Sequence, residues 1–191
     1  MFMNKEAMLK LKGIHLAPYI QLATALIGMP RNCGGNMFRH QMDTLGILID
    51  YGYTDSVLLK ASVIHDLLED IPSQDVNQIL SIDFESYEVY KLVLEVSCRE
   101  TETKGEFLTR VRQTGSHNAK VLKCADRISN MISLGLVMDA EFVKRYIEET
   151  AQYVFPIALE TNLDMLRELT DLVASRTELL NRLSCMADPV R

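Results

Sequence analysis

The 191-residue sequence has few residues that interrupt helices, and it shows no sign of a membrane segment. It contains 9 glycines and 5 prolines, whereas 48% of its residues are hydrophobic. This composition excludes a disordered chain and favours a mostly helical protein with a substantial core. No apolar run reaches the roughly 18 residues that a membrane span needs, and residues 1–6 lack a signal-peptide pattern. We therefore expect a cytoplasmic protein with no membrane partner.

The sequence also lacks a Cys-x-x-Cys unit and an excess of basic residues. Its four cysteines are expected to be free thiols in a reducing cytosol; they are Cys33, Cys98, Cys124 and Cys185. The formal net charge of −6 argues against general nucleic-acid binding, which needs a basic surface. It does not exclude a phosphorylated small molecule, because salt screens distant charges over roughly 8–10 Å.

Apolar residues recur at helical spacing along nearly the whole chain, without the regular alternation of a β-sheet. The predicted helices cover residues 7–27, 38–51, 54–70, 73–80, 84–98, 104–113, 119–138, 140–160 and 163–186. Thr54 and Asp55 are candidate caps, Pro72 ends the third helix, and the two glycines within residues 31–36 indicate a loop. Since there is no repeat, linker or low-complexity tract, the sequence predicts one all-α domain spanning residues 1–191.

Four residues of metal-ligating types are spread over some ninety positions: His40, His65, Asp66 and Asp126. Two imidazoles and two carboxylates form a mixed nitrogen and oxygen ligand set, which suits Mn²⁺, Fe²⁺ or Zn²⁺. His65 and Asp66 are predicted to be neighbours on one helix, roughly 100° apart around its axis. Taken singly, each residue could instead be a core histidine or a helix cap. Taken together, they predict a site for one divalent metal where three helices meet.

Two further carboxylates, Glu69 and Asp70, each follow one member of the His65-Asp66 pair by four residues, which places them on shared helical faces. They are candidates for the general acid and general base of a reaction, and the sequence does not assign the two roles. The alternative is a pair of solvated residues at the end of a helix. Asn130 follows Asp126 at the same spacing and is predicted to line the same pocket.

Basic residues that could meet an anionic substrate are Arg31, Arg39, Lys104, Lys123 and Arg127. Arginine is a strong candidate because its guanidinium group binds phosphate in a bidentate way. For Lys104 we favour a plain surface position. For Arg127, a structural pairing with an acidic residue is an equal alternative.

Three segments resemble the signature segments of HD-domain phosphohydrolases, and most of all the hydrolase domain of the RelA/SpoT alarmone enzymes. They read H-D-L-L-E-D at residues 65–70, K-C-A-D-R-I-S-N-M at residues 123–131 and E-T-A-Q-Y-V-F-P-I-A at residues 149–158. The resemblance extends from about residue 20 to residue 160. It implies a single bundle of about eight helices around one Mn²⁺, which removes the 3′-pyrophosphate of (p)ppGpp to give GDP or GTP and pyrophosphate.

The resemblance also implies a role for each candidate residue. The implied metal ligands are His40, His65, Asp66 and Asp126, the implied catalytic pair is Glu69 and Asp70, and the implied substrate-binding residues are Arg31 and Asn130. Residues 31–40 depart from the family pattern, because one basic residue is missing. Two alternatives therefore stay open: hydrolysis of another nucleotide or phosphate ester, and a degenerate nucleotide-binding domain. The oligomeric state is not indicated.

Overall fold

The computed structural model describes residues 4–187, with side chains as far as residue 183. The α-helices are α1 (Lys5–Gly13), α2 (Ala17–Ala23), α3 (Met37–Asp50), α4 (Ser56–Ile64), α5 (Leu67–Asp70), α6 (Val76–Leu80), α7 (Ser86–Val96), α8 (Lys104–Thr114), α9 (His117–Ser133), α10 (Ala140–Glu149), α11 (Phe155–Thr161) and α12 (Leu163–Ala187). Two 3₁₀ segments, η1 (Thr24–Gly28) and η2 (Leu134–Leu136), and one π-helix, η3 (Thr150–Val154), complete the set.

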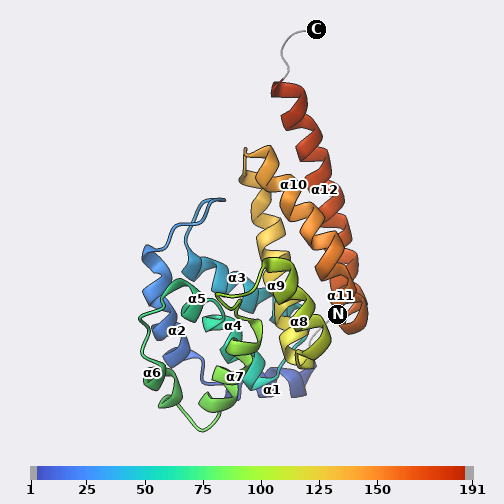
Figure 1. Ribbon diagram of the computed structural model, residues 1–191. Coiled ribbons are helices and arrows are strands. Elements are labelled where there is room, and N and C mark those ends of the chain that lie inside the picture. The colour runs from blue at the N-terminus through green and yellow to red at the C-terminus, as the bar shows by residue number, and fades with distance from the viewer. Residues whose placement is uncertain (1–3, 188–191) are drawn as a thin grey trace.

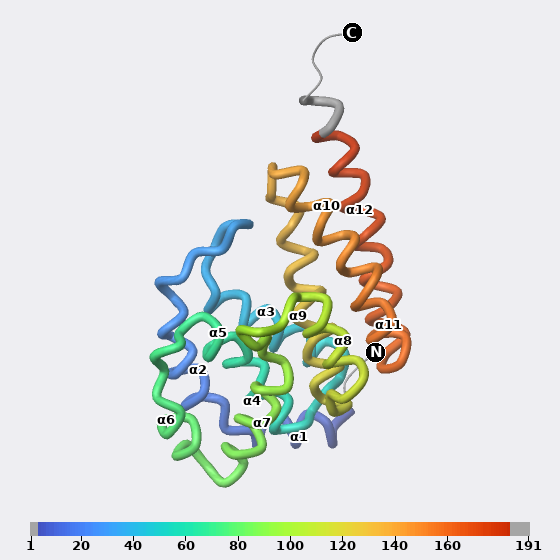
Figure 2. Tube along the Cα trace, viewed as in Figure 1, coloured from blue at the N-terminus to red at the C-terminus, as the bar shows by residue number. Residues whose placement is uncertain are grey.

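The predicted all-α class is confirmed, since the described residues form no strand beyond an isolated bridge between Pro30 and Asn36. Helix α9 is central and contacts α3, α7, α11 and α12. In Figure 1, α2 to α7 lie on one side of α9, whereas α10 and α12 run together on the other. Figure 2 shows that α12 extends past the rest of the bundle towards the C-terminus. No helix in the described part of the chain has the length and hydropathy that a membrane-spanning segment requires.

Two predicted helices are divided because of proline. The segment predicted as one helix over residues 7–27 ends first at Gly13 and resumes at Ala17, with Pro18 in the opening turn of α2. Proline fits the first turn of a helix, but at an interior position it lacks the N–H group that the helical hydrogen bond needs. The helix predicted over residues 140–160 widens into the π-helix η3 just before Pro156, for the same reason.

The helix predicted over residues 54–70 is also wrong in one respect. Of the two candidate caps, Asp55 rather than Thr54 is the one observed, and it accepts a hydrogen bond from the Leu58 amide at 2.8 Å. However, α4 ends at Ile64, and the pair His65-Asp66 lies in a turn before α5. The His65 imidazole Nδ1 lies 2.7 Å from the Ser62 carbonyl, which an uninterrupted helix would pair with the Asp66 amide. The two candidate ligands are therefore not 100° apart on a regular helix.

Three of the four cysteines, namely Cys33, Cys98 and Cys124, are free thiols as predicted. The prediction for Cys185 lies outside the described side chains.

A buried ion-pair network joins α4 to the loop before α7. Lys60 is only 3% exposed, and its Nζ lies 2.8 Å from Asp83 Oδ2 and 2.5 Å from Glu85 Oε2. Tyr19 also donates a hydrogen bond to Asp83, at 3.1 Å. Burial would raise the pKa of Asp83, but hydrogen bonds from Lys60, the Glu85 amide and Tyr19 together outweigh burial and lower it. The hydrogen bond from Lys60 lowers the pKa of Glu85 as well.

This network should make the folded state sensitive to acid. The ordinary pKa values of Asp83 and Glu85, 3.8 and 4.5, fall on folding. Their stabilisation is therefore complete above the ordinary values and is lost as pH falls through the lower folded-state values. In Lys60→Met the free energy of unfolding should fall less steeply with decreasing pH, because folding no longer brings the two carboxylates next to a cation. Urea unfolding between about pH 3 and pH 6 measures it, with the exposed Lys91→Met as control. An equally steep loss in both variants would contradict this prediction.

Candidate metal centre

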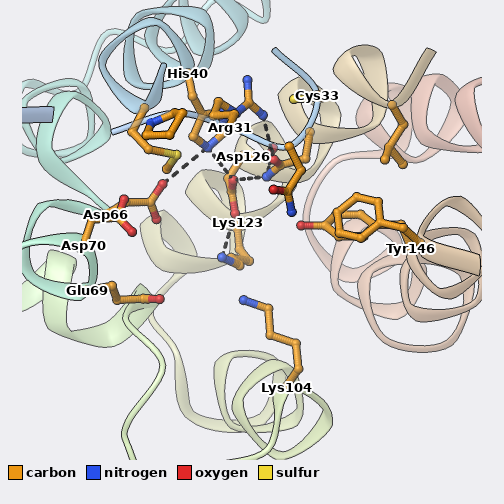
Figure 3. Close-up of a pocket in the computed structure, with 16 residues that line it drawn as sticks. Arg31, Cys33, His40, Asp66, Glu69, Asp70, Lys104, Lys123, Asp126 and Tyr146 are labelled. Atoms are coloured by element: carbon orange, nitrogen blue, oxygen red, sulfur yellow. Dashed lines mark hydrogen bonds and ion pairs between the residues drawn. The ribbon is translucent and has the colours of Figure 1, made fainter. Parts of the chain in front are cut away.

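Four side chains from three parts of the chain converge beside one cavity: His40 on α3, His65 and Asp66 in the α4–α5 turn, and Asp126 on α9. Figure 3 shows His40, Asp66 and Asp126 among the residues that line this cavity. One ligand atom from each lies within 4.8 Å of the others. His40 Nε2 lies 3.0 Å from Asp126 Oδ1 and 3.4 Å from Asp66 Oδ2. His65 Nε2 lies 3.2 Å from Asp66 Oδ2 and 3.8 Å from Asp126 Oδ1. The structure thus brings together the four residues that the sequence singled out.

Hydrogen bonds at the far side of each imidazole orient its Nε2 towards the carboxylates. The His65 Nδ1 faces the Ser62 carbonyl at 2.7 Å. A carbonyl can only accept, so Nδ1 carries the proton and Nε2 has the lone pair in the neutral ring. His40 Nδ1 lies 2.9 Å from the Ser129 hydroxyl, which permits the same arrangement. Both rings therefore present a potential ligand nitrogen to the same point.

The charges of the group are compensated internally. Burial lowers the pKa of His65, but Asp66 and Asp126 outweigh burial and raise that pKa to about 10. The same balance raises the pKa of His40. Burial raises the pKa of Asp126, but Lys123 and the two imidazoles hold it well below its usual range. Two carboxylates thus remain ionised in a buried position because cations surround them.

The group fits a divalent cation by its donor chemistry. Two imidazole nitrogens and two carboxylate oxygens are the ligands that Mn²⁺, Fe²⁺ and Zn²⁺ accept. His65 is 1% exposed, and its Nε2 makes no hydrogen bond of good geometry among the described residues, although Asp66 Oδ2 lies 3.2 Å away. Two imidazole nitrogens and two carboxylate oxygens therefore face one buried point. A cation bound there would neutralise the carboxylates, so these residues could hold a metal ion.

The acidic pair on α5 lies beside this group and lines the cavity (Figure 3). Glu69 accepts a hydrogen bond from the Cys98 amide at 2.7 Å, which fixes its carboxylate. Asp70 Oδ2 is buried and lacks a partner within residues 4–187. Burial, together with the charges of Asp66 and Glu69, raises the pKa of Asp70 to about 6. Asp70 is thus half-buried, whereas Glu69 is exposed and held by one backbone contact.

Arg31 and Asn130 meet at the opposite side of the cavity. The Arg31 guanidinium donates to Asn130 Oδ1 at 2.9 Å and to Ser133 Oγ at 3.3 Å. The Asn130 amide in turn donates to Asp126 Oδ1 at 2.6 Å. The loop that carries Arg31 turns at Gly34 and Gly35, where positive φ angles of 87° and 72° favour glycine. A chain of hydrogen bonds thus links this loop to the candidate metal ligands.

Two lysines add positive charge to the same cavity. Lys123 is buried, and its Nζ lies 2.6 Å from Asp126 Oδ2. Lys104 is exposed, as expected for a surface residue, but it also lines the cavity. The neighbouring Lys123 ammonium lowers the pKa of Lys104. Figure 3 shows Lys104 and Glu69 facing the same open space, so an anion that enters meets at least three basic side chains.

The other two basic candidates lie elsewhere. Arg39 is exposed on α3 and does not line the cavity. Arg127 is 2% exposed; it forms an ion pair with Glu149 and donates to Thr150 Oγ1 at 3.2 Å. Its guanidinium carbon lies 4.9 Å from the centre of the Tyr146 ring. Of the two readings left open by the sequence, the structural pairing is the one observed for Arg127.

An apolar wall of the cavity was not predicted from the sequence. The open cavity, of about 280 Å³, is also lined by Met37, Leu134, Phe142 and Tyr146. Phe142 and Tyr146 are four residues apart on α10 and therefore share a face; their ring centroids lie 5.0 Å apart. That spacing is visible in the sequence, but nothing there shows that this face of α10 turns towards the candidate metal centre.

Comparison with known proteins supports the fold. No family model and no curated protein sequence matches the chain. Among solved structures, a metazoan ortholog of SpoT matches with a TM-score of 0.67 at 20% sequence identity, over 92% of this chain and 98% of that one. That protein is described as hydrolysing ppGpp and as having a role in starvation responses. The chain therefore has an all-α fold similar to that of this protein, and its His/Asp group could bind a metal.

Proposed function

We propose that this chain is a single-domain, metal-dependent phosphohydrolase. Its proposed metal ligands are His40, His65, Asp66 and Asp126, and Mn²⁺ is the preferred ion over Fe²⁺ and Zn²⁺. The observation that carries the proposal is the convergence of these four side chains within 4.8 Å, at a cavity that also holds an acidic pair and basic residues. Such a combination serves an anionic substrate and a reaction that needs proton transfer.

The residues of the cavity divide the chemical work. A divalent ion in the His/Asp group supplies Lewis-acid chemistry, which activates water and neutralises phosphate oxygens. Arg31, Lys104 and Lys123 attract the phosphate groups of the substrate and orient them. Glu69 and Asp70 transfer protons: one of the two residues protonates the leaving oxygen, and the other accepts a proton from the attacking water. Asn130 donates an amide hydrogen bond to Asp126 and presents its oxygen side to Arg31.

We further propose that the substrate is (p)ppGpp and that the bond cleaved is the one to its 3′-pyrophosphate. The three motif segments and the shared fold with a ppGpp hydrolase support this choice. The aromatic wall of Phe142 and Tyr146 offers a surface for a nucleobase. The departure of residues 31–40 from the family pattern favours the second candidate, another nucleotide or phosphate ester. A cytoplasmic enzyme acting on a free nucleotide, without a nucleic-acid partner, fits either substrate.

The test is a substrate panel with the purified protein and Mn²⁺, with EDTA as the metal-free control. We expect ppGpp to give GDP and pppGpp to give GTP, each with one equivalent of pyrophosphate. If (p)ppGpp stays intact while another ester is cleaved, the substrate proposal falls and the hydrolase proposal stands. If no substrate turns over with Mn²⁺, Fe²⁺ or Zn²⁺, the chain is a degenerate nucleotide-binding domain and the proposed function is wrong.

Glu69→Gln should lower turnover by about 10²–10⁴-fold, the usual contribution of a general acid or base. The glutamine oxygen can still accept from the Cys98 amide, so the fold and Mn²⁺ affinity should persist. Rates at saturating substrate and calorimetric Mn²⁺ binding measure the two effects. Glu88→Gln, at an exposed site of α7, is the matched control. Wild-type turnover in Glu69→Gln would contradict a catalytic role, and Glu69 would then only accept a hydrogen bond from the Cys98 amide.

Arg31→Ala should raise KM by roughly ten-fold or more, because a hydrogen bond to a charged group contributes about 1.5–3 kcal/mol. If Arg31 contacts the substrate equally in the ground and transition states, kcat should change little. The control is Arg39→Ala, since Arg39 is exposed on α3 and does not line the cavity. Equal KM values for the two variants would exclude Arg31 from substrate binding.

A further inference from the structure

Two neutral polar side chains, Gln41 and Ser129, contact members of the His/Asp group and do not line the cavity. We propose that both are positioning residues of the metal centre, which hold one imidazole and one carboxylate in the orientation that binds the ion. This inference rests on the proposed metal-dependent function, and it concerns residues that neither contact the cavity nor take part in the proposed chemistry.

Ser129 positions His40. It lies on α9, three residues after Asp126, and is 2% exposed. Its hydroxyl is 2.9 Å from His40 Nδ1, while the Nε2 of the same ring faces Asp126 Oδ1 at 3.0 Å. A hydroxyl that accepts from Nδ1 leaves the Nε2 lone pair free for a ligand. One α9 turn thus supplies both a candidate ligand and the partner that orients a second ligand from α3.

Gln41 positions Asp66. It follows His40 on α3, is fully buried, and donates from Nε2 to Asp66 Oδ2 at 3.0 Å. That oxygen is also the one nearest to both imidazoles, at 3.4 Å from His40 Nε2 and 3.2 Å from His65 Nε2. Asp66 sits in a turn rather than on a helix. The amide of Gln41 is therefore a side-chain contact that fixes this carboxylate from a rigid element.

A role in stability alone does not account for Gln41. Its Oε1 is buried and has no hydrogen-bond partner in the described part of the chain. Such an atom destabilises a fold by about 1–3 kcal/mol. An apolar side chain of similar size would avoid that penalty. A glutamine at this position is advantageous only if its one hydrogen bond, to the candidate ligand Asp66, is needed.

The chain provides a matched control in Ser62. It is buried like Ser129 and it also lies beside a candidate ligand, because its backbone carbonyl pairs with His65 Nδ1 at 2.7 Å. Its hydroxyl, however, donates to the Leu59 carbonyl at 2.8 Å. Ser62→Ala therefore removes a buried hydroxyl and leaves the imidazole contact in place, whereas Ser129→Ala removes the contact itself.

The experiment compares Mn²⁺ binding to wild type, Ser129→Ala, Gln41→Met and Ser62→Ala by isothermal titration calorimetry. Loss of an outer partner typically weakens metal affinity about 10–100-fold, and we expect this for Ser129→Ala and Gln41→Met but not for Ser62→Ala. Thermal unfolding in EDTA is the second measurement. Gln41→Met should unfold in EDTA at the wild-type temperature or above it, while Mn²⁺ raises its unfolding temperature less than that of wild type.

The outcomes separate this inference from the proposed function. Wild-type Mn²⁺ affinity in Ser129→Ala and Gln41→Met would overturn the inference and leave the hydrolase proposal intact. A Gln41→Met protein that loses stability in EDTA but binds Mn²⁺ normally would show a structural role and also overturn it. If wild type binds no Mn²⁺ at all, the metal centre and its positioning residues fail together.

Discussion

Replacement of Asp66 by asparagine is expected to abolish detectable Mn²⁺ binding and hydrolysis. The carboxylate lies 3.2 Å from one imidazole and 3.4 Å from the other, so it is at the centre of the proposed ligand set. Outer partners of a metal site are worth about 10–100-fold in affinity or activity, and loss of a ligand should exceed the upper end of that range. Asparagine keeps the size of the side chain, and its oxygen can still accept from Gln41 Nε2.

The measurements are calorimetric Mn²⁺ binding, the hydrolysis rate and unfolding in EDTA. The metal-free protein should still fold, because His40 and His65 keep Asp126 as a carboxylate partner. Asp43→Asn, an exposed site on α3, makes the same chemical change away from the site and should leave all three quantities at their wild-type values. Retention of Mn²⁺-dependent turnover in Asp66→Asn would remove Asp66 from the metal centre.

Arg127→Met should cause a large loss of stability. Removal of one partner of a buried ion pair costs about 3–5 kcal/mol, because the remaining charge is left without compensation. Glu149 would be that charge, and Thr150 would lose its guanidinium donor. Urea unfolding gives the free energy directly. Arg145→Met, at an exposed site on α10, should change it by less than about 0.5 kcal/mol.

A second substitution identifies the cause. If the loss comes from the uncompensated Glu149, then Glu149→Gln in the Arg127→Met background should recover part of it. If the double variant is as unstable as the sum of the two single variants, the ion pair is not responsible. The lost contact between Arg127 and the Tyr146 ring would then account for the effect.

Local patterns were sufficient to predict most helices, because each depends on neighbouring residues. The α3 and α7 helices show apolar residues at helical spacing, and Asp55 and Asp75 accept hydrogen bonds at helix starts where such residues are favoured. The four candidate metal ligands were also found from the sequence, since their residue types and motif context do not depend on the exact path of the chain.

Features that depend on tertiary contacts were not predictable. The turn at His65-Asp66 involves a side-chain bond to the Ser62 carbonyl, and helical periodicity carries no information about such a bond. The place of Arg127 depended on how η3, which follows α10, packs against α9, because this packing sets the distance from Arg127 to Glu149. Likewise, Lys104 reads as a surface residue until the fold places it at the rim of the cavity.

The candidate ligands come from segments far apart in the chain: His40 and Asp126, whose side chains touch, are separated by 86 residues. Contacts of this kind require closure of long loops and form slowly compared with single helices. A partly folded chain with intact helices would therefore not offer the four ligands together. Metal binding would then occur only once the tertiary structure is complete. An ion that binds the folded protein and not the unfolded chain shifts the folding equilibrium towards the folded protein.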